Sequence, residues 1–263
     1  MKIGSTLIIG AGGIGSHLAE PLARLLTCHA NARPVMRIVD GDVYEHKNAE
    51  RQMFSYRDLG KNKAEALIAR VHDGLPMTDK PVFLGTHERG YVNSDEDAAG
   101  LMMRAIKDKG FIHESVQDRF GDNGGALLVC LCVDNDATRR LFYDGIALLP
   151  ENHRDVVILD CGNDLETATV VASFWKERKS LLASPVECYE NLKNPKDRIP
   201  GGGCQAQAPS TPQLMVANMA AAFSAMLLVQ ALLDGKGFTD VIQSNIREFS
   251  VGLAGGVYGP AQH

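Results

Sequence analysis

The feature that most constrains this chain is a glycine-rich turn between a short apolar strand and a helix. Residues 5–9 read STLII, the turn that follows reads GAGGIG, and the helical run SHLAEPLARLLTCHA comes next. The sequence VMRIVD at 35–40 then predicts a second strand. Strand, glycine turn, helix and strand in this order form a βαβ unit, which is typical of a parallel, doubly wound sheet.

The rest of the chain continues the alternation of helices and strands until residue 175, after which the pattern weakens. The continuous apolar run ALLVCLCVD predicts a strand that is buried on both faces, as in a parallel sheet. The later elements are predicted as helix 61–75, strand 81–87, helix 97–110, strand 126–134, helix 137–149, strand 155–163, an irregular segment 176–212, helix 214–233 and strand 247–253.

Composition excludes several classes of protein. The net charge is −5 and no basic run is present, so we expect no nucleic-acid partner. The six cysteines form no C-x-x-C pair, and Cys130 and Cys132 lie in an apolar run, where they are expected to be buried. The first residues do not resemble a signal peptide. These features favour a cytoplasmic protein with reduced thiols and no zinc.

Residues 214–233 form an uncharged stretch that is long enough to cross a bilayer. The stretch is rich in alanine, includes Asn218, Ser224 and Gln230, and lacks the positive flank that orients a membrane helix. We therefore expect a core or interface helix and no membrane partner.

The glycine turn predicts a nucleotide site. Gly10, Gly12 and Gly15 fit the pattern G-x-G-x-x-G, in which the glycines permit a tight turn, close approach of a phosphate and close packing of helix and strand. Asp40 ends the next strand, where a carboxylate can accept hydrogen bonds from ribose hydroxyls. NAD and ATP proteins both use this arrangement, so the turn alone does not identify the nucleotide.

The segment DGDVYEHKNAERQMF at 40–54 makes the pattern more specific. The motifs GAGGIGS, DGD, NAERQ, LGKNKAEA and CVDND occur in the order and at nearly the spacing of the ThiF/MoeB family of adenylating enzymes. The resemblance covers essentially the whole chain. In finer detail, the motifs look most like those of the ThiF-like proteins of plasmid-borne PRTRC cassettes.

This resemblance implies that the nucleotide is ATP. Arg51 supplies a planar fork of donors and Lys63 a point charge, both suited to a phosphate chain, while Asp134 is placed to hold Mg²⁺. By resemblance, the residues that bind the nucleotide are Gly10, Gly12, Gly13, Gly15, Asp40, Asp42, Asn48, Arg51, Gln52, Lys63, Asp134 and Asn135.

The family reaction is adenylation of a carboxylate, commonly the C-terminal Gly of a small ubiquitin-like or sulfur-carrier protein. The resemblance assigns catalytic roles to Arg51, Lys63 and Asp134. Cys204, in a glycine-rich stretch before the long helix, is a candidate nucleophile for a later transfer. Two alternatives stay open, namely an NAD(P)-dependent oxidoreductase and an inactive relative that only binds nucleotide.

We therefore expect one domain over residues 1–263, with a Rossmann-like, mainly parallel α/β sheet. Its nucleotide-binding part is expected at about 1–165, and a long crossover loop, the long helix and a final strand at about 166–263. The apolar helix also needs burial, and a homodimer interface is one place for it.

Overall fold

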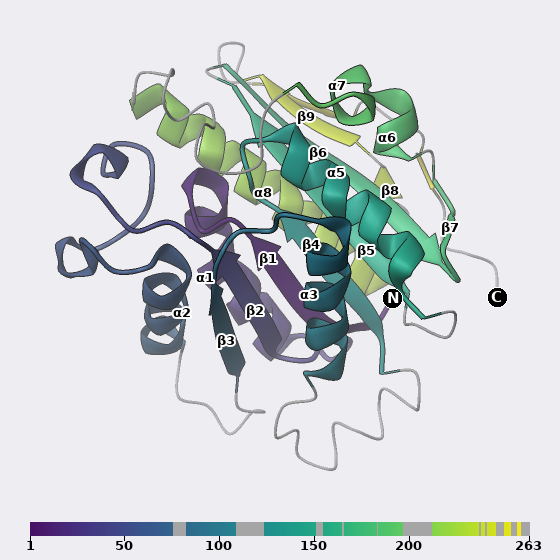
Figure 1. The fold of residues 1–263 in the computed structure, drawn as a ribbon, viewed down its shortest axis with the longest axis horizontal. Coiled ribbons are helices and arrows are strands. Elements are labelled where there is room, and N and C mark those ends of the chain that lie inside the picture. The colour runs from purple at the N-terminus through teal and green to yellow at the C-terminus, as the bar shows by residue number, and fades with distance from the viewer. Residues whose placement is uncertain are drawn as a thin grey trace.

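The chain forms a central sheet that is covered by helices on both faces, as the computed structural model shows (Figure 1). The structure describes residues 1–75, 83–108, 124–150, 155–164, 166–182, 184–196, 212–236, 238–239, 241–245, 250–253 and 257–258.

The strands of the described residues belong to one large sheet and one small pair. The strands are β1 (Ile3–Ile9), β2 (Val35–Asp40), β3 (Leu84–Arg89), β4 (Ala126–Leu131), β5 (Val156–Asn163), β6 (Thr167–Lys176), β7 (Lys179–Ser180), β8 (Phe238–Thr239), β9 (Val241–Asn245), β10 (Ser250–Leu253) and β11 (Val257–Tyr258).

The helices alternate with the strands through the first two thirds of the chain. The α-helices are α1 (Gly13–Cys28), α2 (Lys63–Gly74), α3 (Asp95–Lys107), α5 (Asp136–Gly145), α6 (Pro185–Cys188), α7 (Glu190–Lys193) and α8 (Pro212–Asp234). The 3-10 helices are η1 (His46–Asn48), η2 (Tyr56–Asp58) and η3 (Ile146–Leu148).

The large sheet has the order β3-β2-β1-β4-β5-β6-β9-β10, and β7 pairs with β6. Strands β1 to β5 pair in parallel, whereas β6 is antiparallel to both β5 and β9. The strand order reverses between β1 and β4, which makes this the topological switch point. Ligands of open α/β sheets bind beyond the carboxyl ends of the strands at such a point.

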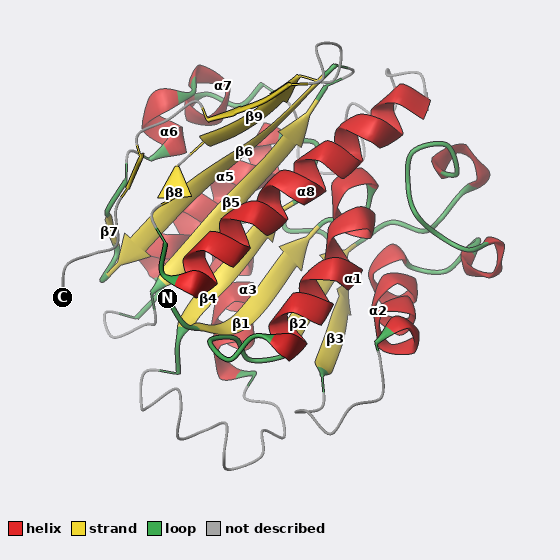
Figure 2. Ribbon diagram, turned by 180° about the vertical axis from the view of Figure 1, so that it is seen from behind, coloured by secondary structure: helices red, strands yellow, loops and turns green. Residues whose placement is uncertain are grey.

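The core lies on both sides of the sheet. Helices α1 and α8 cover one face, and α3 and α5 cover the other (Figures 1 and 2). Every residue of β1 and β4 is buried, because helices exclude water from both faces of these central strands. Ile8 and Leu128 pack under α1 and α8, while Leu7 and Val129 pack toward the opposite helices.

The predicted fold class is confirmed, since the sheet is mainly parallel and flanked by helices. Burial of Cys130 and Cys132 is confirmed as well. The prediction that residues 176–212 are irregular was wrong for its described part, which contains β7, α6 and α7. These elements are only two to four residues long, so they leave no periodic pattern in the sequence.

Helix α8 is long and apolar enough to cross a membrane, yet 56% of its apolar stretch is buried inside the structure. Its buried side packs on α1, β5 and β6. Its other side exposes large apolar side chains, namely Val216, Met219, Phe223 and Leu227. The helix therefore contributes to the core along one face and leaves a second apolar face at the surface.

Candidate functional site

The glycine turn after β1 has the close contacts that require glycine. Gly10 has φ +92°, and a Cβ there would lie 2.7 Å from the carbonyl oxygen of Cys132. A Cβ on Gly15 would lie 2.0 Å from the carbonyl oxygen of Gly10. At Gly12, in contrast, the nearest atom to a Cβ is Nε2 of Gln52 at 3.6 Å. Gly10 and Gly15 therefore shape the turn, whereas Gly12 leaves space beside Gln52.

Gly13 makes room for a side chain of α8, a role that its place in the motif did not reveal. A Cβ on Gly13 would lie 2.4 Å from Nδ2 of Asn218. This amide is buried and donates a hydrogen bond of 2.9 Å to the carbonyl oxygen of Arg51. Gly13 thus allows α8 to hold the backbone of the residue that is predicted to bind phosphate.

Asp40 links the glycine turn to the loop after β2. Its Oδ2 accepts a hydrogen bond of 2.7 Å from the backbone N–H of Ala11, and its Oδ1 accepts one of 2.8 Å from the N–H of Asp42. Burial raises the pKa of the Asp40 carboxyl, and this effect outweighs the opposing effect of the Lys63 ammonium. Each oxygen keeps a lone pair, so ribose hydroxyls can still donate to this carboxylate.

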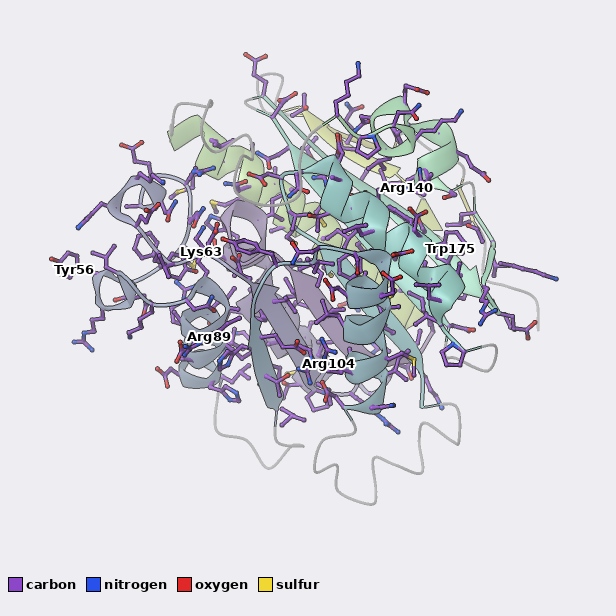
Figure 3. All side chains as sticks on the ribbon, viewed as in Figure 1. Tyr56, Lys63, Arg89, Arg104, Arg140 and Trp175 are labelled. Atoms are coloured by element: carbon purple, nitrogen blue, oxygen red, sulfur yellow. The ribbon has the colours of Figure 1, made fainter. Side chains whose placement is uncertain are left out.

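The loop between β2 and α2 projects from the sheet, as the position of Tyr56 at its outer end shows (Figure 3). Its inner part is packed. The rings of Tyr44 and Phe54 stack with their centroids 4.5 Å apart. The N–H of Met53 donates a hydrogen bond of 3.0 Å to Oγ of Ser16 in α1. These contacts fix the part of the loop that contains the predicted phosphate-binding residues.

Three side chains of this loop have buried polar atoms that no described residue satisfies. They are Nδ2 of Asn48, Nε of Arg51, and both amide atoms of Gln52. Asn48 is 1% exposed and Gln52 is 2% exposed. A buried polar atom without a partner costs free energy, so the native state tolerates it where an external group supplies the missing hydrogen bond. The loop therefore holds three donor atoms and one amide oxygen that a ligand can satisfy.

Lys63 is the first residue of α2, and Figure 3 shows it between the projecting loop and the sheet. Its side chain is only 2% exposed, and its Nζ lies 3.1 Å from Oδ2 of Asp42. Asn62 caps the helix and donates hydrogen bonds to the carbonyl oxygens of Asp40 and Asp42. A buried cation is thus placed at the carboxyl end of β2.

Tyr91, from the segment after β3, was not among the predicted site residues. Its hydroxyl donates a hydrogen bond of 2.5 Å to Oδ1 of Asp42. Burial pushes the pKa of Asp42 upward, but the Tyr91 hydroxyl and the Lys63 ammonium outweigh it and leave this pKa below its usual value. The same hydrogen bond raises the pKa of Tyr91 to about 12.

Asp134 is exposed in the turn between β4 and α5, on the other side of the switch point. Asn135 caps α5, since its Oδ1 accepts a hydrogen bond of 2.7 Å from the N–H of Thr138. Arg139 contacts this turn, since its Nη2 donates a hydrogen bond of 2.8 Å to the carbonyl oxygen of Val133. The helix cap at Asn135 can be predicted from the sequence, because asparagine is a common cap residue. The contact of Arg139 with Val133 has no such sequence pattern.

The remaining predictions concern metals and the nucleophile. Cys204 lies outside the described residues. No group of three or more His, Cys, Asp or Glu side chains gathers into a metal site within the described part of the chain. Mg²⁺ that is shared between a nucleotide and one or two carboxylates does not need such a group. The metal role of Asp134 therefore stays a prediction.

Comparisons with known proteins identify the family of the chain and the solved structures that share its fold. The sequence matches the ThiF family over residues 2–232, so the chain belongs to the ThiF family. No curated protein matches the sequence.

Solved structures share the fold at low sequence identity. E. coli MccB with AMPCPP and MccA has a TM-score of 0.56 and 14% identity, with 99% of this chain and 66% of that chain covered. PaaA has a TM-score of 0.54 and 15% identity, with 96% of this chain and 64% of the PaaA chain covered. The chain thus spans slightly less than two thirds of the length of these proteins.

The close contacts of the glycine turn predict that alanine is tolerated at one position and not at another. Gly15→Ala forces a Cβ onto the carbonyl of Gly10, so it is expected to lower the free energy of unfolding by about 3 kcal/mol or more. Gly12→Ala makes only an ordinary contact, so it is expected to cost less than about 1 kcal/mol. Urea unfolding measures both values, and equal stability of the two variants would contradict this geometry.

Proposed function

We propose that this protein uses ATP to adenylate the C-terminal carboxylate of a peptide or small protein. The observation that supports it most is the set of buried, unpartnered polar atoms on Asn48, Arg51 and Gln52. These groups lie in the loop that Asp40 and Asn218 join to the glycine turn and to α8. A phosphate chain offers the acceptor oxygens that such donors lack.

The charges of the site suit a triphosphate. Arg51 and Lys63 supply two cations that neutralise the β- and γ-phosphates, and the turn that opens α1 adds backbone N–H groups and the positive end of a helix dipole. Asp134 is proposed to hold Mg²⁺, which would offset charge on the leaving pyrophosphate. Asp40 is proposed to accept hydrogen bonds from the ribose.

The reaction depends on the orientation of the phosphates and on stabilisation of the leaving pyrophosphate, and it does not require a base. An oxygen of the substrate carboxylate forms a bond to the α-phosphorus of ATP, the bond from that phosphorus to the β-phosphate oxygen breaks, and pyrophosphate leaves. The carboxylate is already ionised at neutral pH, so no proton is transferred. The residues of this chain hold the phosphates in line and stabilise the charge that moves onto the pyrophosphate.

The substrate is proposed to be a peptide or small protein. MccB, which shares the fold, has been crystallised with ATP and with the peptide MccA. The finer proposal is a small ubiquitin-like or sulfur-carrier protein with a C-terminal Gly, with transfer of the acyl group to Cys204 after adenylation. A cytoplasmic location accords with such a partner.

The oxidoreductase alternative explains the glycine turn and Asp40 but gives no function to Asn48, Arg51, Gln52 or Lys63. An inactive relative would have no need for the full set of cations. Membership of the ThiF family also supports ATP over a nicotinamide nucleotide. Adenylation therefore explains more of the site than either alternative.

Removal of either cation is expected to reduce carboxylate-dependent ATP–pyrophosphate exchange by about 10²–10³-fold, since each acts as a preorganised charge on the transition state. The measurement compares Arg51→Ala and Lys63→Ala with Lys61→Ala, an exposed lysine of the same loop, in the presence of small proteins and peptides that end in Gly-Gly. Lys61→Ala is expected to keep wild-type activity. Full exchange in both site variants, with folding intact, would refute the proposal.

The exposed face of α8 supports a homodimer. Val216, Met219, Phe223 and Leu227 are each 43–59% exposed and follow one another at intervals of three, four and four residues. This spacing places them on one stripe of the helix. We propose that a second copy of the chain covers this stripe about a two-fold axis.

A charge in the stripe is expected to separate the subunits. Light scattering after gel filtration is expected to give about twice the monomer mass of 28.5 kDa for the wild-type chain and for Leu181→Glu, whose side chain is exposed elsewhere. Phe223→Glu is expected to give a monomer because a buried, unpaired carboxylate opposes association. A wild-type monomer, or a Phe223→Glu dimer, would exclude this interface.

A further inference from the structure

Three side chains from separate elements form a continuous chain of polar contacts at the end of β2. The hydroxyl of Tyr91 donates to Oδ1 of Asp42 at 2.5 Å, and Nζ of Lys63 lies 3.1 Å from Oδ2 of the same carboxylate. Tyr91 follows β3, Asp42 follows β2, and Lys63 opens α2. The two oxygens of one carboxylate thus join an aromatic residue to a cation of the proposed nucleotide site.

The position of the Lys63 ammonium depends on Asp42. The lysine side chain is almost fully buried, and Asp42 is its one ion-pair partner among the residues that the structure describes. A carboxylate turns readily about its terminal torsion, because that torsion has broad minima. An aspartate held by the lysine alone would therefore not fix the direction in which the ammonium points.

The Tyr91 hydroxyl removes this freedom. An O–H···O⁻ hydrogen bond of 2.5 Å is short and charge-assisted, so it fixes one oxygen and leaves the other to Lys63. A tyrosine hydroxyl is protonated at neutral pH, so it acts as the donor to Asp42. Because the tyrosine takes one oxygen, the carboxylate cannot place both oxygens on the lysine.

Tyr91 is 48% exposed, and its ring contacts the backbone at Gly41. A Cβ on Gly41 would lie 2.6 Å from ring carbons of Tyr91, so the absence of a side chain at Gly41 lets the ring lie over the backbone. The ring and the hydroxyl therefore have separable functions. The ring packs on Gly41, whereas the hydroxyl orients Asp42.

We propose that Tyr91 is a positioning residue, which fixes Asp42 and through it directs the Lys63 ammonium toward the β- and γ-phosphates of the nucleotide. The inference rests on the proposed function for the identity of the ligand. Without the hydroxyl, Asp42 can turn both oxygens to Lys63 and draw the cation away from the phosphates. The loss of binding affinity is then specific to ligands that carry the β- and γ-phosphates.

Calorimetric titration with ATP and with AMP tests this specificity. Tyr91→Phe keeps the ring and removes only the hydroxyl, so it is expected to weaken ATP binding about tenfold while AMP binding stays within about twofold. Tyr56→Phe makes the same chemical change on a side chain that is 80% exposed, and it is expected to alter neither affinity. A general loss of structure would weaken both nucleotides alike, which would contradict a positioning role.

A double-mutant cycle shows whether Tyr91 acts through Asp42. In an Asp42→Asn background, Tyr91→Phe is expected to change ATP affinity less than about twofold, because the carboxylate that it orients is gone. A tenfold loss in both backgrounds, or unchanged ATP affinity in Tyr91→Phe alone, would overturn the proposal. A wild-type chain that binds neither ATP nor AMP would instead refute the proposed function, and this inference with it.

Discussion

The carboxylate of Asp40 joins the two loops from which the site is built. One oxygen accepts the N–H of Ala11 in the glycine turn, and the other accepts the N–H of Asp42 in the loop after β2. The carbonyl oxygen of the same residue accepts from Asn62, which caps the helix that begins with Lys63. The end of β2 thus sets the relative positions of the glycine turn and the Lys63 ammonium.

The loop between β2 and α2 is packed against its neighbours, but some of its buried polar atoms have no partner among the described residues. Stacking of Tyr44 on Phe54 and the contact of Asn218 with Arg51 hold the backbone. Buried amide and guanidinium atoms nevertheless stay unsatisfied by described residues, at a cost of about 1–3 kcal/mol for each buried group. The proposed nucleotide has acceptor oxygens that would satisfy the donors among these atoms and so offset part of this cost.

Sequence reasoning located the parts of the site that have local patterns. The glycine turn and the acid at the end of β2 have a local pattern, because a strand, a turn and a helix fix their spacing. The loop with Arg51 has no such pattern, and its predicted function comes from the resemblance to the ThiF/MoeB family. Asn218 and Tyr91 were not found as site residues. Their partners Arg51 and Asp42 lie 167 and 49 residues away, and only the assembled sheet and helices bring each pair together.

A crystal structure with Mg²⁺ and a non-hydrolysable ATP analogue would show whether the glycine turn and the loop after β2 bind the nucleotide together. We expect phosphate oxygens within hydrogen-bond distance of Arg51, Gln52 and Lys63, with the phosphate chain beside Gly12 and the ribose at Asp40. An analogue bound elsewhere, or ordered water on these buried groups with no phosphate at the glycine turn, would contradict this expectation.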